Sequence, residues 1–347
     1  MHLHEPSWWY GSPDGVVPRV LSPLAHVWAR IAESRFAKVR PYRANVPVVC
    51  IGNFTAGGTG KTPLAREIAA RLTGIGHTPI VLSRGYGGRI TGPHLVDPEK
   101  DSAHDVGDEP LLHAAHTPTV IARDRAAGAR FIEARHTTCD VIVMDDGLQN
   151  AALAKSLSIA VVDGRRGLGN GRVIPAGPLR ACLEFQLGLS DVIVVVEPVS
   201  SQPAVSAVTG VLSARFSGSI LHATIVPTHE TDWLAMQPVV AWAGIGAPSR
   251  FFDLLRGCGA QIVHTAAFPD HHMPRQDEAR ALLGMAATYG AIIVTTQKDH
   301  ARLRGGTGAL AELGTRSRVL AVEMRLEQQS SARLDALLAG AVKAAPV

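Results

Sequence analysis

Residues 46–72 read VPVVCIGNFTAGGTGKTPLAREIAARL, and this stretch decides the fold class. The apolar run 46–52 is typical of a buried strand, and the apolar spacing of 62–72 predicts a helix with Pro63 in its first turn. Between them lies a glycine-rich loop, which reads Thr55-Ala56-Gly57-Gly58-Thr59-Gly60-Lys61-Thr62. A strand, a glycine loop and a helix in this order predict a phosphate-binding loop in an α/β protein.

The residue types of this loop suit a nucleoside triphosphate. Its glycines let successive backbone N–H groups curl around phosphate oxygens, Lys61 can reach the β- and γ-phosphates, and the Thr62 hydroxyl suits Mg²⁺. The general motif has glycine where this chain has Thr55. The nearest candidate for a guanine-specific element, residues 296–299, has the wrong spacing because lysine directly precedes aspartate. We therefore predict that residues 55–62 bind ATP.

Further apolar runs alternate with helical patterns along the rest of the chain. They occupy residues 78–83, 119–122, 140–146, 158–164 and 191–197, and a second set occupies 238–246, 262–268, 291–296 and 318–324. Val/Ile runs separated by helices indicate a doubly wound, mainly parallel sheet that is covered on both faces. A weakly patterned stretch separates the two sets. We expect an N-terminal segment 1–45, a P-loop core 46–217 and a smaller α/β domain 218–347.

An apolar strand that ends in acid is the usual companion of a phosphate-binding loop. The run 141–144 is followed directly by Asp145 and Asp146. At the carboxyl end of a strand beside the loop, one aspartate can hold Mg²⁺ while the other orients the lysine or the substrate. We predict a metal site built from Thr62, Asp145 and Asp146, with Gln149 able to add a polar contact.

Composition narrows the class of protein. The 347 residues are 46% hydrophobic and 18% charged, which is too apolar for a disordered chain. No apolar run approaches the ~18 residues that span a bilayer, and the N-terminus lacks the pattern of a signal peptide, so we expect a cytoplasmic location. The four cysteines have no CxxC spacing, which argues against a disulfide framework and against a zinc site.

The positive charge is concentrated in one segment. The chain has a net charge of +4, and residues 16–45 hold six cations against Glu33: Arg19, Arg30, Arg35, Lys38, Arg40 and Arg43. The apolar residues of 20–31 follow helical spacing, so the segment is an amphipathic helix with a basic face. Trp8, Trp9 and Tyr10 precede it, which is typical of a helix at an anionic lipid surface. Packing of its apolar face on the protein's own core is the alternative.

Eight blocks of sequence carry a resemblance to a known family. They are VPVVCIGNFTAGGTGKTP (46–63), LSRGYGG (82–88), VGDEP (106–110), ARDR (122–125), DDGLQ (145–149), VDGRRGLGNGRVIPAGPLR (162–180), FPDHH (268–272) and TTQKD (295–299). In this order they closely resemble tetraacyldisaccharide 4′-kinase, the lipid A 4′-kinase of Gram-negative bacteria. The loop of that family reads TxGGTGKT, which accounts for Thr55.

The resemblance implies phosphorylation, with ATP and Mg²⁺, of the 4′-hydroxyl of an acylated disaccharide 1-phosphate, giving lipid IVA in lipid A biosynthesis. It also implies work at the cytoplasmic face of the inner membrane, which favours the lipid-surface interpretation of residues 16–45, and no nucleic-acid partner. Asp108 is implied as the base, paired with His271 from the second domain as the domains close, while Lys61 binds phosphate. The arginines of the matching blocks suit the phosphate groups: Arg84, Arg123, Arg125 and Arg180.

Two positions depart from the pattern of the family. Asn150 stands where the family has histidine, and Ala181 stands where it has an acidic residue. Any contribution of these two positions to substrate contact is therefore in doubt. From the residues alone, two alternatives stay open: a nucleotide switch or ATPase that docks on membrane or nucleic acid, and a kinase of a soluble small molecule.

Overall fold

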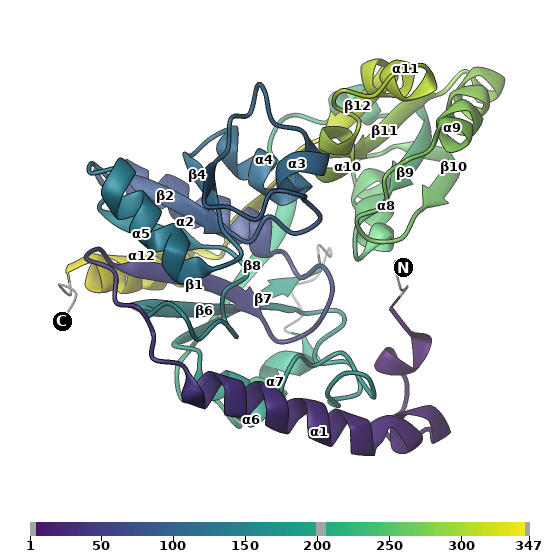
Figure 1. Cartoon of the computed structure of the whole chain (residues 1–347). Helices are drawn as coiled ribbons and strands as arrows, with labels where there is room; N and C mark the ends of the chain where they lie inside the picture. Colours follow the sequence, from purple (N-terminus) through teal and green to yellow (C-terminus); the bar gives the residue numbers. More distant parts are fainter. Residues whose placement is uncertain (1–4, 199–205, 344–347) are drawn as a thin grey trace.

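The computed structural model describes residues 5–198 and 206–343, which form two α/β bodies (Figure 1). In the described residues the larger body is built on a nine-stranded sheet with the order β13-β8-β7-β6-β1-β5-β2-β4-β3. Its strands are β1 Val48–Asn53, β2 Pro79–Ser83, β3 His94–Leu95, β4 Thr119–Ile121, β5 Val141–Met144, β6 Leu157–Asp163, β7 Val192–Glu197, β8 Ser219–Pro227 and β13 Val322–Leu326. Only the outer pairs β13/β8 and β3/β4 are antiparallel.

Helices cover both faces of this sheet, so its central strands are buried throughout. One face packs against α2 (Lys61–Gly74) and α12 (Gln328–Lys343). The other face packs against α5 (Arg125–Arg135) on one half. Its other half is covered by α1 Val16–Lys38, α6 Leu183–Gly188 and α7 Ala207–Ser213. The prediction of a doubly wound, mainly parallel sheet of the P-loop type is thus confirmed.

The smaller body contains a four-stranded parallel sheet in the order β10-β9-β11-β12. These strands are β9 Pro238–Ala243, β10 Gln261–Ala267, β11 Ile292–Thr296 and β12 Ser317–Leu320. Helix α8 (Pro248–Gly257) packs on one face, and α9 (Gln276–Tyr289) and α11 (Ala309–Arg316) pack on the other. The remaining short helices are η1 Ser7–Tyr10, α3 Ala103–Val106, α4 Asp108–Ala114, η2 Asp232–Leu234 and α10 Gln297–Arg302.

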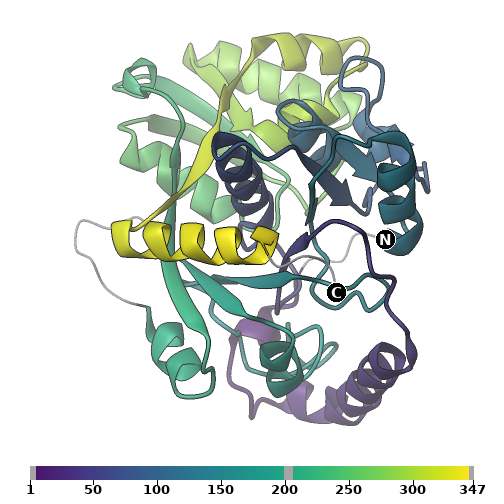
Figure 2. The same ribbon diagram turned by 90° about the vertical axis from the view of Figure 1, so that its left-hand side faces the viewer.

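The sheets divide the chain differently from the expected regions 46–217 and 218–347. Strands β8 and β13 and helix α12 belong to the large body, so the chain leaves that body after β8 and returns at β13 (Figure 2). The apolar run 318–324, expected as one strand, is divided between β12 and β13. An apolar run has the same pattern in either sheet, so periodicity alone does not show where the chain passes from the small sheet to the large one. Residues 1–4, 199–205 and 344–347 of the expected regions lie outside the described residues.

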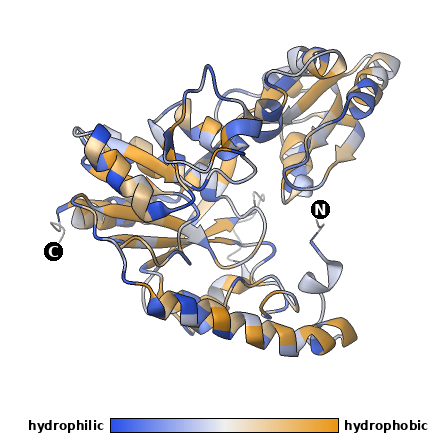
Figure 3. Cartoon of the chain, viewed as in Figure 1, coloured by the Kyte–Doolittle hydropathy of each residue, from blue (hydrophilic) through white to orange (hydrophobic). Residues whose placement is uncertain are grey.

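Helix α1 lies along the edge of the large body beside α6 and α7 (Figure 1). It docks mainly through the small side chains Ala25 and Ala29, with Leu21 and Phe36 half-buried beside them, while most of its large apolar side chains are exposed. The exposed set is Val16, Val17, Val20, Leu24, Val27, Trp28 and Ile31. In Figure 3, hydrophobic and hydrophilic residues alternate along helix α1. The apolar stripe is therefore an outer surface of the molecule, and the helix packs on the core by its small-residue face.

The aromatic residues before α1 do not have the arrangement expected of a lipid anchor, in which all of them would be exposed to lipid. Trp9 donates its indole N–H to the carbonyl of Pro175 at 3.1 Å, and its own carbonyl accepts a bond from the Asn170 amide. Trp8 is half-buried, whereas Tyr10 is exposed. Both tryptophans thus hold η1 against the 169–175 loop. Among the described helices, none has the length and apolar character needed to cross a bilayer.

Candidate active site

The glycine loop joins the central strand β1 to helix α2 at the carboxyl edge of the large sheet. Gly57 and Gly60 have φ angles of 96° and 103°, a backbone conformation that favours glycine. A Cβ at Gly60 would also lie 3.3 Å from the Met324 methyl carbon. The loop therefore needs glycine at both positions, and it presents its N–H groups at the start of α2.

Lys61 and Arg180 converge on Asp146. Its Oδ1 lies 3.6 Å from Lys61 Nζ and 2.9 Å from an Arg180 guanidinium nitrogen. Burial alone would raise the pKa of this carboxyl, but the two cations hold it below its usual range. Asp146 has a φ of 51°, which is uncommon for a residue other than glycine and is typical of functional sites. Lys61, Asp146 and Arg180 thus form one charged cluster beside the loop.

Asp145, the residue before Asp146, uses one of its two carboxylate oxygens in a buried pair. Its Oδ2 is 2.9 Å from Nε2 of His113 on α4, and both side chains are almost completely buried. Its Oδ1 is buried with no hydrogen-bond partner. The buried Arg125 guanidinium also donates to the Asp145 carbonyl at 3.4 Å. These contacts hold the carboxyl end of strand β5 in place.

Asp108 and His271 come from different bodies and meet at the boundary. Asp108 is the first residue of α4, and His271 follows β10. His271 Nδ1 lies 3.4 Å from Asp108 Oδ2, and His271 has a φ of 58°. Burial lowers the pKa of His271, but the Asp108 carboxylate outweighs this effect and raises it. The structure thus places together the two residues that the sequence singled out as base and partner.

A cavity of about 690 Å³ lies between the two bodies and contains the loop. Its lining includes residues 56–62, Asp146, Arg180, His271 and Lys298. Apolar side chains from β8, α8 and β12 form another part of the wall. One end of the cavity is therefore cationic and suits phosphate groups. The other end is apolar and suits a flat ring.

Several predicted site residues do not line this cavity. Thr55 is buried, and its carbonyl accepts a bond from Arg180 at 3.2 Å, so it positions that arginine. Gln149 donates at 2.7 Å to both the Asn53 carbonyl and the Gln186 side chain. Arg84 and Arg123 are exposed on loops after β2 and β4, outside the lining. The buried Arg125 donates to backbone carbonyls, so its position suits support of β5 rather than contact with a phosphate.

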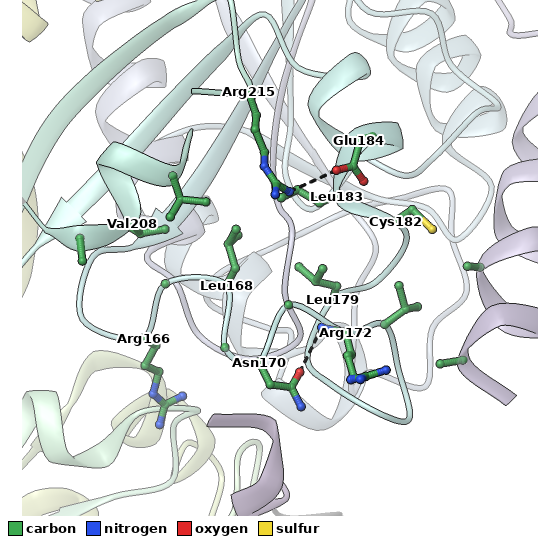
Figure 4. Close-up of a pocket in the computed structure, with 18 of the residues that line it drawn as sticks. Arg166, Leu168, Asn170, Arg172, Leu179, Cys182, Leu183, Glu184, Val208 and Arg215 are labelled. Carbon is green, nitrogen blue, oxygen red and sulfur yellow. Dashed lines mark hydrogen bonds and ion pairs between the residues drawn. The ribbon is translucent and has the colours of Figure 1, made fainter. Parts of the chain in front are cut away.

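A second cavity, of about 680 Å³, lies between α1 and the 164–184 segment (Figure 4). Figure 4 shows Leu168, Leu179 and Val208 in its wall, and an ion pair of 3.2 Å between Arg215 and Glu184. Arg172 donates to Ser22 on α1 at 2.6 Å, which ties the helix to this wall. The cavity thus combines apolar and cationic surface on the docking side of α1, which contributes Ser22, Ala25 and Ala29 to its wall.

Three residues at the boundary of the two bodies were missed as site residues from the sequence. Lys298 pairs with Glu109, and Glu109 is also 3.4 Å from the Thr62 hydroxyl. Arg302 pairs with Asp108. Glu109 and Lys298 lie in the VGDEP and TTQKD blocks, directly beside Asp108 and Asp299. Their place in these blocks could therefore have identified them as site residues. Arg302 lies outside every block, and only the fold brings it to the site.

The oxygens beside the loop suit a magnesium ion. Mg²⁺ is usually held by one or two carboxylates together with substrate phosphates and water, rather than by an all-protein cage. In keeping with this, the described residues contain no cluster of three or more His, Cys, Asp or Glu side chains arranged to hold a metal. The Asp146 carboxylate, the Thr62 hydroxyl and the unpartnered Oδ1 of Asp145 supply the hard oxygens required. The residues present therefore fit the ion.

The sheet order, the loop after its central strand and the acidic end of the neighbouring strand define a protein of the P-loop nucleotide-binding class. The family described as tetraacyldisaccharide-1-P 4'-kinase matches residues 17–340. A tetraacyldisaccharide 4'-kinase of Methylorubrum extorquens (strain PA1) is 46% identical over 95% of this chain and 98% of its own length. One of Bradyrhizobium sp. is 48% identical, over 87% of this chain and 86% of its own.

The chain belongs to the tetraacyldisaccharide-1-P 4'-kinase family, as the resemblance in its sequence blocks predicted. Among solved structures, that of LpxK from Aquifex aeolicus in complex with ATP has the same fold. Its TM-score is 0.70 at 24% identity, and the match covers 94% of this chain and 100% of the other.

Proposed function

We propose that this protein is a lipid kinase that transfers the γ-phosphoryl group of ATP to the 4′-hydroxyl of tetraacyldisaccharide 1-phosphate, giving lipid IVA. Family membership over residues 17–340 supports the reaction. The observation that carries it is the geometry at one cavity, where the glycine loop, the Lys61–Asp146–Arg180 cluster and the Asp108–His271 pair meet.

The phosphates of ATP bind across the loop and the start of α2. Backbone N–H groups of residues 56–62 hold the α- and β-phosphates, and Lys61 reaches the β- and γ-phosphates. Phosphoryl transfer is catalysed mainly by positioning and by neutralising charge, and Lys61 and Arg180 supply cations for that purpose. Thr62, Asp146 and Asp145 would hold Mg²⁺, and the ion would supply positive charge that offsets part of the charge of the phosphates. Asp146 orients Lys61 and Arg180 through its ion pairs.

The Asp108–His271 pair accepts the proton of the 4′-hydroxyl. Asp108 is held as a carboxylate, and His271 lines the cavity with its Nδ1 directed at that carboxylate. A donated Nδ1–H fixes the tautomer of the imidazole and raises its basicity. Because the two residues belong to different bodies, the base is complete only when the smaller body lies close to α4.

The outward stripe of α1 meets the membrane surface at the cytoplasmic face of the inner membrane. Apolar side chains such as Leu24 and Trp28 are more than half exposed on a helix that also carries Arg30 and Arg35. A helix of this kind inserts its apolar side into the interface and pairs its cations with anionic lipid. The basic segment thus serves a lipid surface and not a nucleic acid.

Binding of ATP and binding of lipid vesicles, each measured separately, test the proposed kinase function before any turnover is measured. With Mg²⁺, ATP should quench or shift a probe in the cavity, and Asp146→Asn should weaken this Mg²⁺-dependent binding because a carboxylate proposed to hold the ion is lost. Vesicles that carry the acceptor should bind the protein more strongly than vesicles without it. Tight, salt-sensitive binding to DNA or RNA and none to vesicles would favour a nucleotide switch instead.

A further inference from the structure

Arg302 at the end of α10 is a buried arginine whose whole guanidinium is paired. Its side chain is 2% exposed. Nε and Nη2 both donate to Oδ2 of Asp108, with Nε at 2.8 Å. Nη1 donates at 2.6 Å to Asp299 Oδ1 and at 2.6 Å to the carbonyl of Gly244. Asp299 is itself held by the Gly244 amide at 3.0 Å and by the Thr296 hydroxyl at 2.6 Å.

We propose that Arg302 is a positioning residue that keeps Asp108 ionised and aims it at His271. This inference rests on the proposed function, in which Asp108 and His271 accept the proton. A guanidinium fork fixes a carboxylate in direction as well as in charge, which a single ammonium does not. Here two arms of the fork hold one oxygen of Asp108, and the third arm is anchored on the smaller body.

The charges around Asp108 explain why this fork is needed. Its cations are Arg302 and Lys298 on α10 and His271 after β10, and its nearby anions are Glu109, Asp270 and Asp299. Burial alone would raise the pKa of Asp108, but the His271 contact and the charges of Arg302 and Lys298 hold the pKa below its usual range. Arg302 makes the closest of these ion pairs. Without it, the remaining cations, Lys298 and His271, are shared with two other carboxylates, Glu109 and Asp270.

The same fork joins the two bodies of the protein. Asp108 begins α4 of the large body, whereas Arg302, Asp299 and Gly244 belong to the smaller one. The carbonyl oxygen of Gly244 also accepts a hydrogen bond from the backbone N–H of His271 at 3.1 Å. One carbonyl therefore anchors both the residue that holds Asp108 and the residue that pairs with it. The distance from Asp108 to His271 is set by Arg302 in this arrangement.

Carboxyl-carbon NMR of Asp108 tests the inference without turnover. The full-length protein is labelled with ¹³C at the aspartate side-chain carboxyl, and Asp108→Asn assigns the signal. In the wild type the Asp108 signal stays at its ionised position from about pH 8 to about pH 4.5. In Arg302→Met the carboxyl loses its strongest cation, so its midpoint rises and the signal titrates within that range. The control Arg316→Met removes an exposed arginine from a 3.4 Å pair with Glu312 and leaves the Asp108 titration unchanged.

Kinetics on the same variants separate positioning from simple structural support. In Arg302→Met the acid limb of the kcat profile moves to the pH at which the NMR titration shows Asp108 gaining its proton, while KM for ATP stays near the wild-type value. Arg302→Lys keeps the charge without the fork, so its acid limb stays in place and its kcat is intermediate. Should Arg302→Met fail to fold, Arg302→Lys alone still decides, because a wild-type kcat in that variant contradicts the need for a fork.

Two results would overturn the inference. One is an unshifted Asp108 titration in folded Arg302→Met. The other is a loss of kcat in that variant with no movement of the acid limb, which is what a merely structural residue would give. If the wild type transfers no phosphate at all, the proposed function fails, while the NMR titration still reports whether Arg302 controls Asp108.

Discussion

Removing the outward apolar side chains of α1 should detach the protein from membranes without unfolding it. The perturbation is the triple variant Val20→Ser, Leu24→Ser and Trp28→Ser. These residues are 70%, 60% and 52% exposed, and the helix docks through Ala25 and Ala29 on another side. The fold therefore loses little packing, and the melting temperature should stay close to that of the wild type.

The size of the effect follows from the exposed apolar surface. Complete burial of a large apolar side chain contributes about 1.5–3 kcal/mol, and half to two-thirds of that surface is available on each of the three. Their joint loss weakens insertion by about 3–5 kcal/mol, which corresponds to about a 100- to 4,000-fold weaker partition into vesicles. The cations of α1 keep a residual attraction that salt removes and that requires anionic lipid.

Sedimentation with sucrose-loaded vesicles of phosphatidylethanolamine and phosphatidylglycerol measures the partition. The matched control replaces three exposed apolar residues elsewhere, Ile75, Met236 and Tyr289, by serine. It removes apolar surface of similar exposure and should bind vesicles as the wild type does. Equal binding by the α1 variant and the wild type, or an equal loss in the control, would refute the role given to the outward stripe.

Three further predictions concern the site. Lys61→Ala should lower kcat by about 100- to 1,000-fold, because a cation at the developing charge is lost; steady-state assays at saturating ATP check this, and a loss confined to KM would contradict it. Asp108→Asn should abolish most turnover with a modest change in ATP affinity, measured by calorimetry; unchanged turnover would remove Asp108 as part of the base. His271 has its pKa raised above 6.5 in the folded state, so its stabilising effect is complete below pH 6.5 and is lost as the pH rises through the folded value. Urea unfolding across this range should show a decline of at most ~1.4 kcal/mol per pH unit that His271→Gln removes, and an identical slope in the variant would contradict the pairing.

Local features of the site could be predicted from the sequence because they lie within short windows. The loop 55–62 and the acidic end of β5 need only a strand, a few residues and the start of a helix to be recognised. The opposite roles of Asp145 and Asp146 follow from backbone direction: Asp146, with its positive φ, faces Lys61, while Asp145 turns to the buried His113.

Long-range pairings could not be predicted in this way. Strand β13 lies beside β8 although some 95 residues separate their ends in sequence, and its apolar pattern would equally suit the small sheet. Arg302 is 194 residues from Asp108, and its own neighbourhood in the sequence resembles an ordinary helix end. The outward direction of the α1 stripe was also undecided, because amphipathic spacing does not show which side docks. Small residues at Ala25 and Ala29 decide it, since they allow close approach to α6 and α7.

Transfer of phosphate to the lipid acceptor is the defining activity of the proposed kinase and can be measured with the purified protein. Purified full-length protein is incubated with Mg²⁺, γ-labelled ATP and tetraacyldisaccharide 1-phosphate in mixed micelles, with Lys61→Ala as the control. The lipid is analysed by mass spectrometry and phosphorus NMR. We expect one added phosphoryl group at the 4′ position with the wild type and almost none with the control. Hydrolysis of ATP at a normal rate with no phosphate on the lipid would contradict this expectation.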